Sequence, residues 1–148
     1  MSTFVFNPKI NDPFASITES ALGGTGDGWT DTEVGKCVKL GTANNYVLCA
    51  DGNEIEGVCI SMEPITVNSG FSFGTVQKDR RMNAVLDTGE TGVAVGDLVV
   101  AGAQAAVGTA NSSGYPVVAT GTPTTHKWRV IRLLTAGEAG DIVVIERI

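Results

Sequence analysis

Turn-forming residues recur so often along this chain that the apolar runs between them are all short. From about residue 33 onward, clusters of Gly, Pro, Asn and Asp separate stretches of mainly Val, Ile and Leu. Turn signals spaced by about eight to twelve residues are typical of the short strands of β-barrels and sandwiches. The sequence therefore predicts an all-β fold, an antiparallel β-barrel or sandwich of roughly ten short strands.

The expected strands follow from the positions of these apolar stretches. They cover residues 33–40, 46–50, 55–61, 65–67, 71–77, 81–87, 98–102, 105–107, 117–119, 126–134 and 142–148. Asp51-Gly52 is a strong hairpin signal, so the second and third of these strands are expected to pair. A further hairpin is expected between the fourth and the fifth.

Composition favours strands over helices. The chain has 148 residues, of which 19 are Gly, and Gly is a poor helix residue. Val is common among the apolar side chains, and Val fits strands well. A chain of this length can bury a real core, so its stability requires neither a metal nor a disulfide.

Two short stretches nearly repeat each other: "GDLVV" at 96–100 and "GDIVV" at 140–144. Gly can adopt a turn conformation that is closed to other residues. Asp can accept hydrogen bonds from the amides of the same turn. Each Gly-Asp step is therefore expected to lead from an exposed turn into a buried strand.

The charge of the chain disfavours some partners. The net charge of −6 repels phosphates, so nucleic acid is not expected as a partner. The sequence has no apolar run of about eighteen residues, so no membrane span is expected. Its first residues lack the basic start and apolar middle of a signal peptide, and we expect the protein to be made in a cytoplasm.

The N-terminal region differs from the rest of the chain. Residues 1–33 are predicted to form an extended arm, and residues 34–148 the β-domain. The arm carries prolines and a Gly-rich stretch, but its aromatic side chains still favour burial. These side chains either contact a neighbouring subunit or lie over their own domain. They belong to Phe4, Phe6, Phe14 and Trp29.

The sequence offers no recognisable catalytic constellation, so we predict neither an enzyme nor a cofactor. Cys37, Cys49 and Cys59 lie within apolar strand patterns and fit a core better than a zinc site, whose ligands are more closely spaced. The single histidine, His126, fits the solvated end of a strand better than a catalytic base, which needs a positioned partner. The acidic stretch "DGNEIE" at 51–56 hints weakly at calcium, but a solvated turn explains it better.

Basic residues gather in two places on this acidic chain. Lys78, Arg80 and Arg81 form the first cluster, which is either a solvated hairpin loop or a docking point for an acidic partner. The second is "HKWRVIR" at 126–132, in which Trp128 could anchor an interface or simply belong to the core.

Three stretches together resemble a known family. They are "EVGKCVKLGTANNYVLCADGNEIEGVCISM" at 33–62, "GVAVGDLVVAG" at 92–102 and "KWRVIRLLTAGEAGDIVVIERI" at 127–148. In cadence and Gly placement they resemble the β-rich capsid decoration, or cement, proteins of tailed phages. The resemblance implies a homotrimer that binds the major capsid protein on the outer surface of the virion and stabilises the expanded shell.

Two other functions remain open. The first is a different phage structural β-domain, from a tail tube, a head-completion part or a fibre base, which would form larger rings. The second is a trimeric β-fold nucleotide hydrolase of the dUTPase kind. That enzyme needs an Asp-bearing nucleotide motif and a Gly-rich aromatic tail, and the closing strand "DIVVIERI" supplies neither.

Overall fold

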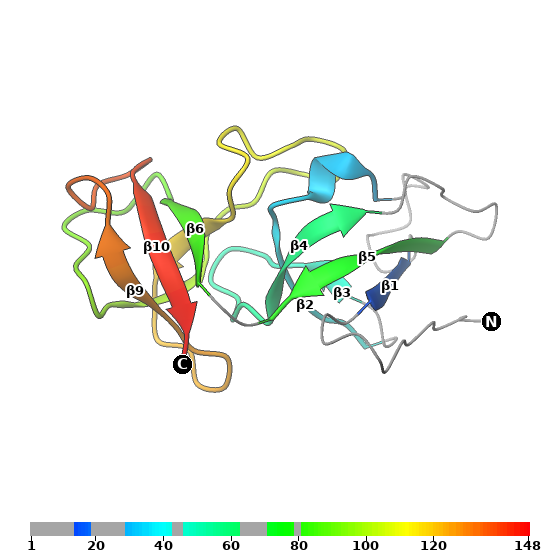
Figure 1. Ribbon diagram of the computed structural model, residues 1–148, viewed down its shortest axis with the longest axis horizontal. Helices are drawn as coiled ribbons and strands as arrows, with labels where there is room; N and C mark the ends of the chain where they lie inside the picture. The colour runs from blue at the N-terminus through cyan, green and yellow to red at the C-terminus, as the bar shows by residue number, and fades with distance from the viewer. Residues whose placement is uncertain (1–13, 19–28, 43–45, 63–70, 79–80) are drawn as a thin grey trace.

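The computed structural model of the protein describes residues 14–18, 29–42, 46–62, 71–78 and 81–148. Its regular elements are strands, apart from one turn of 3-10 helix, and this confirms the predicted all-β class. Figure 1 shows two halves side by side, a closed β-barrel on the left and a β-sheet on the right.

The sheet half contains the first five strands, in the order β1-β5-β4-β2-β3, and all its pairs are antiparallel. Its edge strands β1 and β3 lie near one another, so the sheet curls. The helical turn η2 precedes β2. The elements are β1 (Phe14–Thr18), η2 (Asp31–Glu33), β2 (Cys37–Leu40), β3 (Tyr46–Leu48), β4 (Gly57–Met62) and β5 (Phe71–Gln77).

The barrel half closes in the order β10-β6-β8-β7-β9. The β6–β8 pair is parallel, and the other pairs are antiparallel. Closure covers most of the sheet edges, which are otherwise prone to aggregate. The strands are β6 (Arg81–Leu86), β7 (Leu98–Ala101), β8 (Val117–Thr120), β9 (Trp128–Leu133) and β10 (Ile142–Arg147).

Part of the predicted arm belongs to the sheet half. Residues 14–18 form β1, an edge strand that pairs with β5 and that the sequence did not indicate. Trp29 is buried in a second apolar cluster of the sheet half, together with Val38 and Tyr46. Trp29 therefore packs against its own domain, which is one of the two alternatives given for the aromatic side chains of the arm.

The two Gly-Asp steps behave as predicted. Gly96 and Gly140 have φ values of 101° and 82°, which favour Gly. Asp97 accepts a hydrogen bond from the N–H of Ala94, and Asp141 accepts one from the N–H of Glu138, three residues earlier in each case.

The same two steps also bond to a neighbouring strand in the same way. Gly96 donates its N–H to the carbonyl of Val130, and Val130 donates to the carbonyl of Asp97. Gly140 and Asp141 make the equivalent pair of bonds with Leu86. Each step therefore fixes the start of one barrel strand against another strand.

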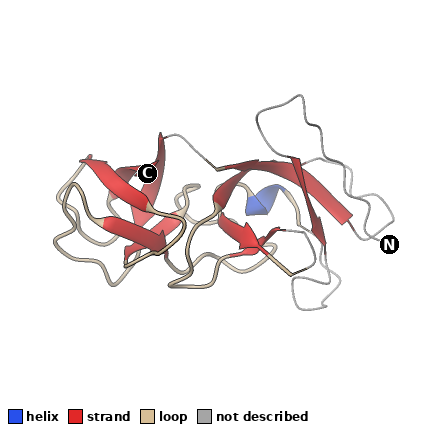
Figure 2. Cartoon of the chain, turned by 90° about the horizontal axis from the view of Figure 1, so that it is seen from below, coloured by secondary structure: helices blue, strands red, loops and turns tan. Residues whose placement is uncertain are grey.

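The halves are joined by two loops, which run in opposite directions. The barrel strap, residues 102–116 between β7 and β8, reaches from the barrel to the sheet. In Figure 1 it is the yellow loop that approaches η2. The sheet strap, residues 49–56 between β3 and β4, reaches from the sheet to the barrel. Figure 2 shows tan loops running between the two sets of strands from another side.

A buried ion pair holds the barrel strap. Lys36 Nζ lies 3.1 Å from Glu33 Oε1, and both side chains are 0% exposed. Lys36 also donates to the carbonyl of Ala106, and the N–H of Gly108 donates to Glu33 at 2.7 Å. Burial by itself would raise the pKa of Glu33, but these donors and those of Thr30 and Thr32 lower it below 4.5.

Two amide side chains complete this contact and explain why one expected strand is absent. Asn111 accepts from the N–H of Ala105 at 2.8 Å and donates to Gln104, which in turn accepts from the N–H of Cys37. The strand predicted at 105–107 is therefore wrong, because the backbone there bonds to side chains and to a turn instead of a neighbouring strand.

The sheet strap pairs with the end of β7. Gly52 donates its N–H to the carbonyl of Ala101 at 2.8 Å, and Ala101 donates to the carbonyl of Asn53 at 2.9 Å. The turn at Asp51-Gly52 exists, but the predicted hairpin is wrong because β2 lies between β3 and β4. The other predicted hairpin begins at residues 65–67, which lie outside the described residues.

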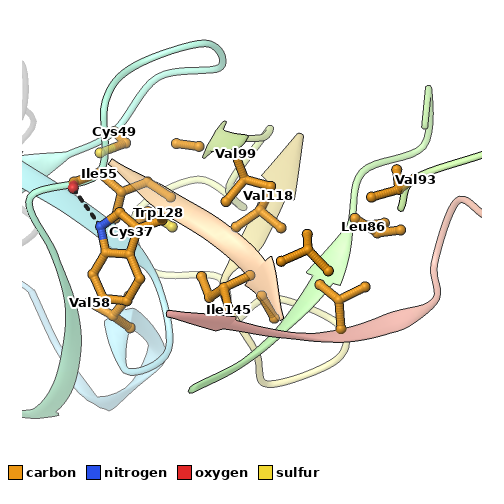
Figure 3. Close-up of a cluster of buried hydrophobic side chains, with 14 residues drawn as sticks. Cys37, Cys49, Ile55, Val58, Leu86, Val93, Val99, Val118, Trp128 and Ile145 are labelled. Carbon is orange, nitrogen blue, oxygen red and sulfur yellow. Dashed lines mark hydrogen bonds between the residues drawn. The ribbon is translucent and has the colours of Figure 1, made fainter. Parts of the chain in front are cut away.

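The core is continuous across the junction of the two halves. Figure 3 shows Cys37, Cys49 and Ile55 of the sheet half packed in one cluster with Trp128 and Val118 of the barrel. The Trp128 indole N–H donates to the carbonyl of Ile55 at 2.9 Å. Burial of these apolar surfaces stabilises the junction as well as each half.

Candidate interaction face

Arginine side chains gather on the outer surface of the barrel, over β6, β10 and β9. Strand pairing places Glu146 of β10 between Arg81 of β6 and Arg129 of β9. Arg132 of β9 is paired with Val144 of β10 and is exposed. Successive side chains of a regular strand point to opposite faces. Arg129 and Arg132, three residues apart, share a face because the register of β10 against β9 shifts after Val144. We call Arg81, Arg129, Arg132 and Glu146 the arginine face.

Glu146 bridges two of the three arginines. Its Oε1 lies 3.2 Å from Arg81 Nε, and its Oε2 lies 3.3 Å from Arg129 Nη2. Hydrogen bonds from Arg81 and then from Arg129 lower the pKa of Glu146 below 4.5. The arginine side chains remain 69% and 46% exposed, so the pairs are surface ion pairs that add little stability.

The arginine face is thus positive on an acidic protein. It holds three arginines and one glutamate, whereas the whole chain carries a net charge of −6. Guanidinium groups bind carboxylates in a bidentate manner and are common at interfaces. The face is therefore suited to an acidic protein surface.

The structure brings together two basic segments that the sequence treated separately. Arg81 comes from the first cluster, and Arg129 and Arg132 come from the second. Their meeting depends on β10, whose Glu146 was not singled out in the sequence. A single Glu in the apolar run "IVVIE" was the available signal for it.

Lys78 lies away from the arginine face. Its ammonium group is 5.0 Å from the centroid of the Tyr46 ring, in the sheet half, which is a cation–π contact. Its carbonyl accepts a hydrogen bond from Arg147 at 2.8 Å. Lys78 therefore helps to hold the connection between the halves.

Trp128 is a core residue and offers no exposed anchor. It is 0% exposed, and its indole N–H is bonded within the chain. Of the two alternatives for Trp128, the structure supports the core, because its ring lies in the buried cluster at the junction, beside Ile55 and Val58 (Figure 3).

The other predicted contact residues cannot be placed on this face. Phe4, Phe6 and Arg80 lie outside the described residues. Phe14 is the first residue of β1, and its side chain also lies outside what is described. Their roles in binding a partner stay predictions.

The three cysteines are buried and free, so their predicted place in the core is confirmed. Burial raises the pKa of both Cys49 and Cys59 to about 12, and it raises that of Cys37 well above 9.0. The thiolate is the reactive form of cysteine, so these thiols are poor nucleophiles at neutral pH.

His126 is part of a structural network. Its Nδ1 lies 2.8 Å from Arg147 Nη2, and its Nε2 lies 3.5 Å from Glu56 Oε1. Arg147 also donates to the carbonyls of Glu56 and Lys78. The network ties β10 to the sheet half at the start of β9.

Glu54, in the acidic stretch at 51–56, holds a loop of the barrel. It accepts hydrogen bonds from the backbone N–H groups of His126, Thr124 and Thr125, and from the Thr124 hydroxyl. These bonds, that of His126 first, lower the pKa of Glu54 to about 2. Within the described ranges, no group of three or more His, Cys, Asp or Glu side chains is arranged to hold a metal ion.

The fold defines the chain as an all-β protein with a closed five-stranded barrel beside a curled sheet. No protein-family model, no curated protein and no solved structure matches it. The described part of the chain has no helix long and apolar enough to cross a membrane.

Proposed function

We propose that this protein is a structural virion protein that binds the outer surface of a phage capsid as a homotrimer and stabilises the expanded shell. The observation that carries the proposal is the arginine face, an exposed positive surface on an acidic protein. Its proposed partner is an acidic surface of the major capsid protein. The family resemblance of the sequence points to the same role.

The joining of the two halves supports a mechanical role. A continuous apolar core, the buried ion pair of Lys36 and Glu33, and two opposed straps connect them. Relative motion of the halves would break buried polar bonds, whose loss is costly. A body that resists such motion is suited to transmit force between capsid subunits.

The mechanism requires no chemical step. A protein that binds only the assembled, expanded shell adds its binding free energy to the cost of separating the subunits. Charge complementarity at the arginine face would guide docking and select the partner, more than it would set the total affinity.

Co-sedimentation with expanded heads tests the proposal, using heads assembled from the major capsid protein of the same virus. We expect a trimer by light scattering and binding to expanded heads in preference to unexpanded ones. Arg129→Glu combined with Arg132→Glu should weaken binding by at least about tenfold at physiological salt.

A control variant distinguishes the effect of the arginine face on binding from the effect of total charge. Lys39→Glu, in β2 of the sheet half, makes the same change in total charge as Arg129→Glu alone. It should bind almost normally, whereas Arg129→Glu should bind more weakly. Hexameric or larger rings, attachment to tails, hydrolysis of a nucleotide, or an equal loss in these two single variants would each contradict the proposal.

A further inference from the structure

A groove lies between the sheet half and the barrel half, beside β6. Its volume is about 260 Å³, and its walls come from β4, from the end of β5, from β6 and from the last residues of the barrel strap. The lining residues that matter here are Ile60, Met82, Asn83, Tyr115 and Pro116.

The backbone of β6 alternates between two neighbours. The N–H of Leu86 donates toward β10, to the carbonyl of Asp141. The N–H groups of Val85 and Asp87 donate toward β8, to the carbonyls of Pro116 and Val118, both at 2.9 Å. By this alternation, the N–H and carbonyl of Asn83 also point away from β10, on the side where β8 lies.

At Asn83, however, β8 has not yet begun. The β6–β8 pairing covers only Val85 with Val117 and Leu86 with Val118. The residue before Val117 is Pro116, which has no N–H to donate to the Asn83 carbonyl. Among the described residues no strand continues this ladder, so the first half of β6 presents an open edge to the groove.

Two partly exposed apolar side chains lie along this edge. Ile60 is 42% exposed, and Tyr115 is 36% exposed. Ile60 is the unpaired residue of a β-bulge, because the register of β4 against β5 shifts between Cys59 and Ser61. A bulge turns a side chain away from the regular face of a sheet, and bulges are common beside binding sites.

The groove adjoins the arginine face, because both include β6. Arg81, which is 69% exposed, is the first residue of that strand, two residues before Asn83. A segment lying along the open edge would therefore come near a guanidinium group at the start of β6. The surface combines backbone pairing, an apolar pocket and a positive charge.

We infer that this groove binds an extended, acidic segment of a partner protein, which adds to β6 as a strand. The segment pairs with the backbone at Asn83, places one apolar side chain against Ile60 and Tyr115, and places an acidic side chain near Arg81. Strand addition takes its affinity from main-chain bonds and its specificity from side-chain pockets. The inference deepens the proposed function, on which it rests for the identity of the partner.

Amide hydrogen exchange measured by NMR tests whether the edge is open. In the full-length protein at low concentration, the amide of Asn83 should exchange much faster than that of Ala84, which faces β10. A slow amide at Asn83 in dilute protein would mean that the chain covers its own edge. Slowing that depends on protein concentration would mean that a second copy occupies it. Either result overturns the inference.

A blocked hexapeptide of alternating Glu and Val serves as the probe for binding. It should slow exchange at Asn83 and shift the resonances of Tyr115, whereas the same peptide with Lys in place of Glu, or with a central Pro, should not. Absence of an effect at millimolar peptide would overturn the inference.

A matched pair of variants locates the contact. Ile60→Ser should weaken peptide binding by about tenfold, as expected for the loss of an anchoring side chain. Leu134→Ser is the control, because Leu134 is a similarly exposed apolar residue, at 47%, outside the groove. Equal binding by the two variants would overturn the inference.

The peptide assay tests the groove, and the capsid assay tests the proposed function, so the two claims can be contradicted independently. If the peptide binds at Asn83 but the protein does not attach to heads, the groove stands and the proposed function is wrong. If heads bind wild type and Ile60→Ser equally while Asn83 stays exchangeable in the complex, the function stands and the groove inference is wrong.

Discussion

The barrel strap is held by buried charge and amide groups, whereas the sheet strap is held by backbone pairing, one indole and one carboxylate. In the first, Lys36 and Glu33 are completely buried beneath residues 102–116. In the second, Glu54 of the strap accepts hydrogen bonds from the backbone of residues 124–126, and the next residue, Ile55, accepts one from the Trp128 indole. The two straps complete one junction by different physical means.

The difference follows from the composition of each strap. The barrel strap consists of small and polar residues, "GAQAAVGTANSSGYP", which offer little apolar surface to bury. Buried polar groups must be hydrogen-bonded, which fixes one geometry. The sheet strap contains Ile55, which is fully buried, and can use the hydrophobic effect. The two straps should therefore respond differently to substitution and to pH.

The largest effect is expected from breaking the buried ion pair. Lys36→Met leaves the Glu33 carboxylate buried beside an apolar side chain, which should lower the free energy of unfolding by about 3–5 kcal/mol. Urea denaturation measures this loss. The control, Lys36→Met with Glu33→Gln, leaves no unpaired charge and should lose less. If Lys36→Met is as stable as wild type, the buried ion pair is not what holds the barrel strap.

A smaller effect is expected from the indole that holds the sheet strap. Trp128→Phe leaves the buried carbonyl of Ile55 without its donor, which should cost about 1–3 kcal/mol. Hydrogen exchange should rise in residues 49–56 in particular. Trp29→Phe is the matched control, because Trp29 is also buried but packs within the sheet half. Faster exchange of 49–56 in that control would show that the effect is not specific to the strap.

The smallest effect is expected from Glu54, and it depends on pH. Its pKa of about 2 in the folded protein lies below the ordinary 4.5. Ionised Glu54 therefore stabilises the fold above about pH 4.5, and this contribution is lost as the pH falls toward 2. Thermal unfolding between pH 6 and 2.5 should show a shallower acid loss for Glu54→Gln.

Only part of the acid sensitivity should disappear in Glu54→Gln. Hydrogen bonds also lower the pKa of Glu33, Asp87, Asp141 and Glu146. These groups lose their contribution in the same direction as they become protonated. Identical acid curves for wild type and Glu54→Gln would show that the contacts of Glu54 with residues 124–126 do not stabilise the folded state.

The strands were predictable because their signals are local. Short apolar runs bounded by turn residues gave β2 to β10 to within a few residues, and the geometry of Gly96-Asp97 and Gly140-Asp141 followed from two residue types. The strand β1 escaped prediction because its sequence, "FASIT", is too short and too irregular in its apolar positions to show a period of two.

The arginine face was predictable only in pieces. The basic residues were visible, but their meeting around Glu146 depends on β10 inserting between β6 and β9. Trp128 illustrates the same difficulty, because alternation shows that one side of β9 is buried but leaves open whether a partner or the protein's own core buries it. The Asp51-Gly52 turn suggested a hairpin because the sequence carries no information about a third strand lying between.

The amino-acid sequence by itself determined the all-β class, most of the strands, the turns that bound them and the burial of the cysteines. These depend on local conformational preference and on the alternation of apolar and polar side chains. The tertiary structure alone decided the strand order, the two straps, the buried pair of Lys36 and Glu33, and the open edge of β6. Each of these joins groups far apart in the chain, and such contacts form only when many weak interactions act together.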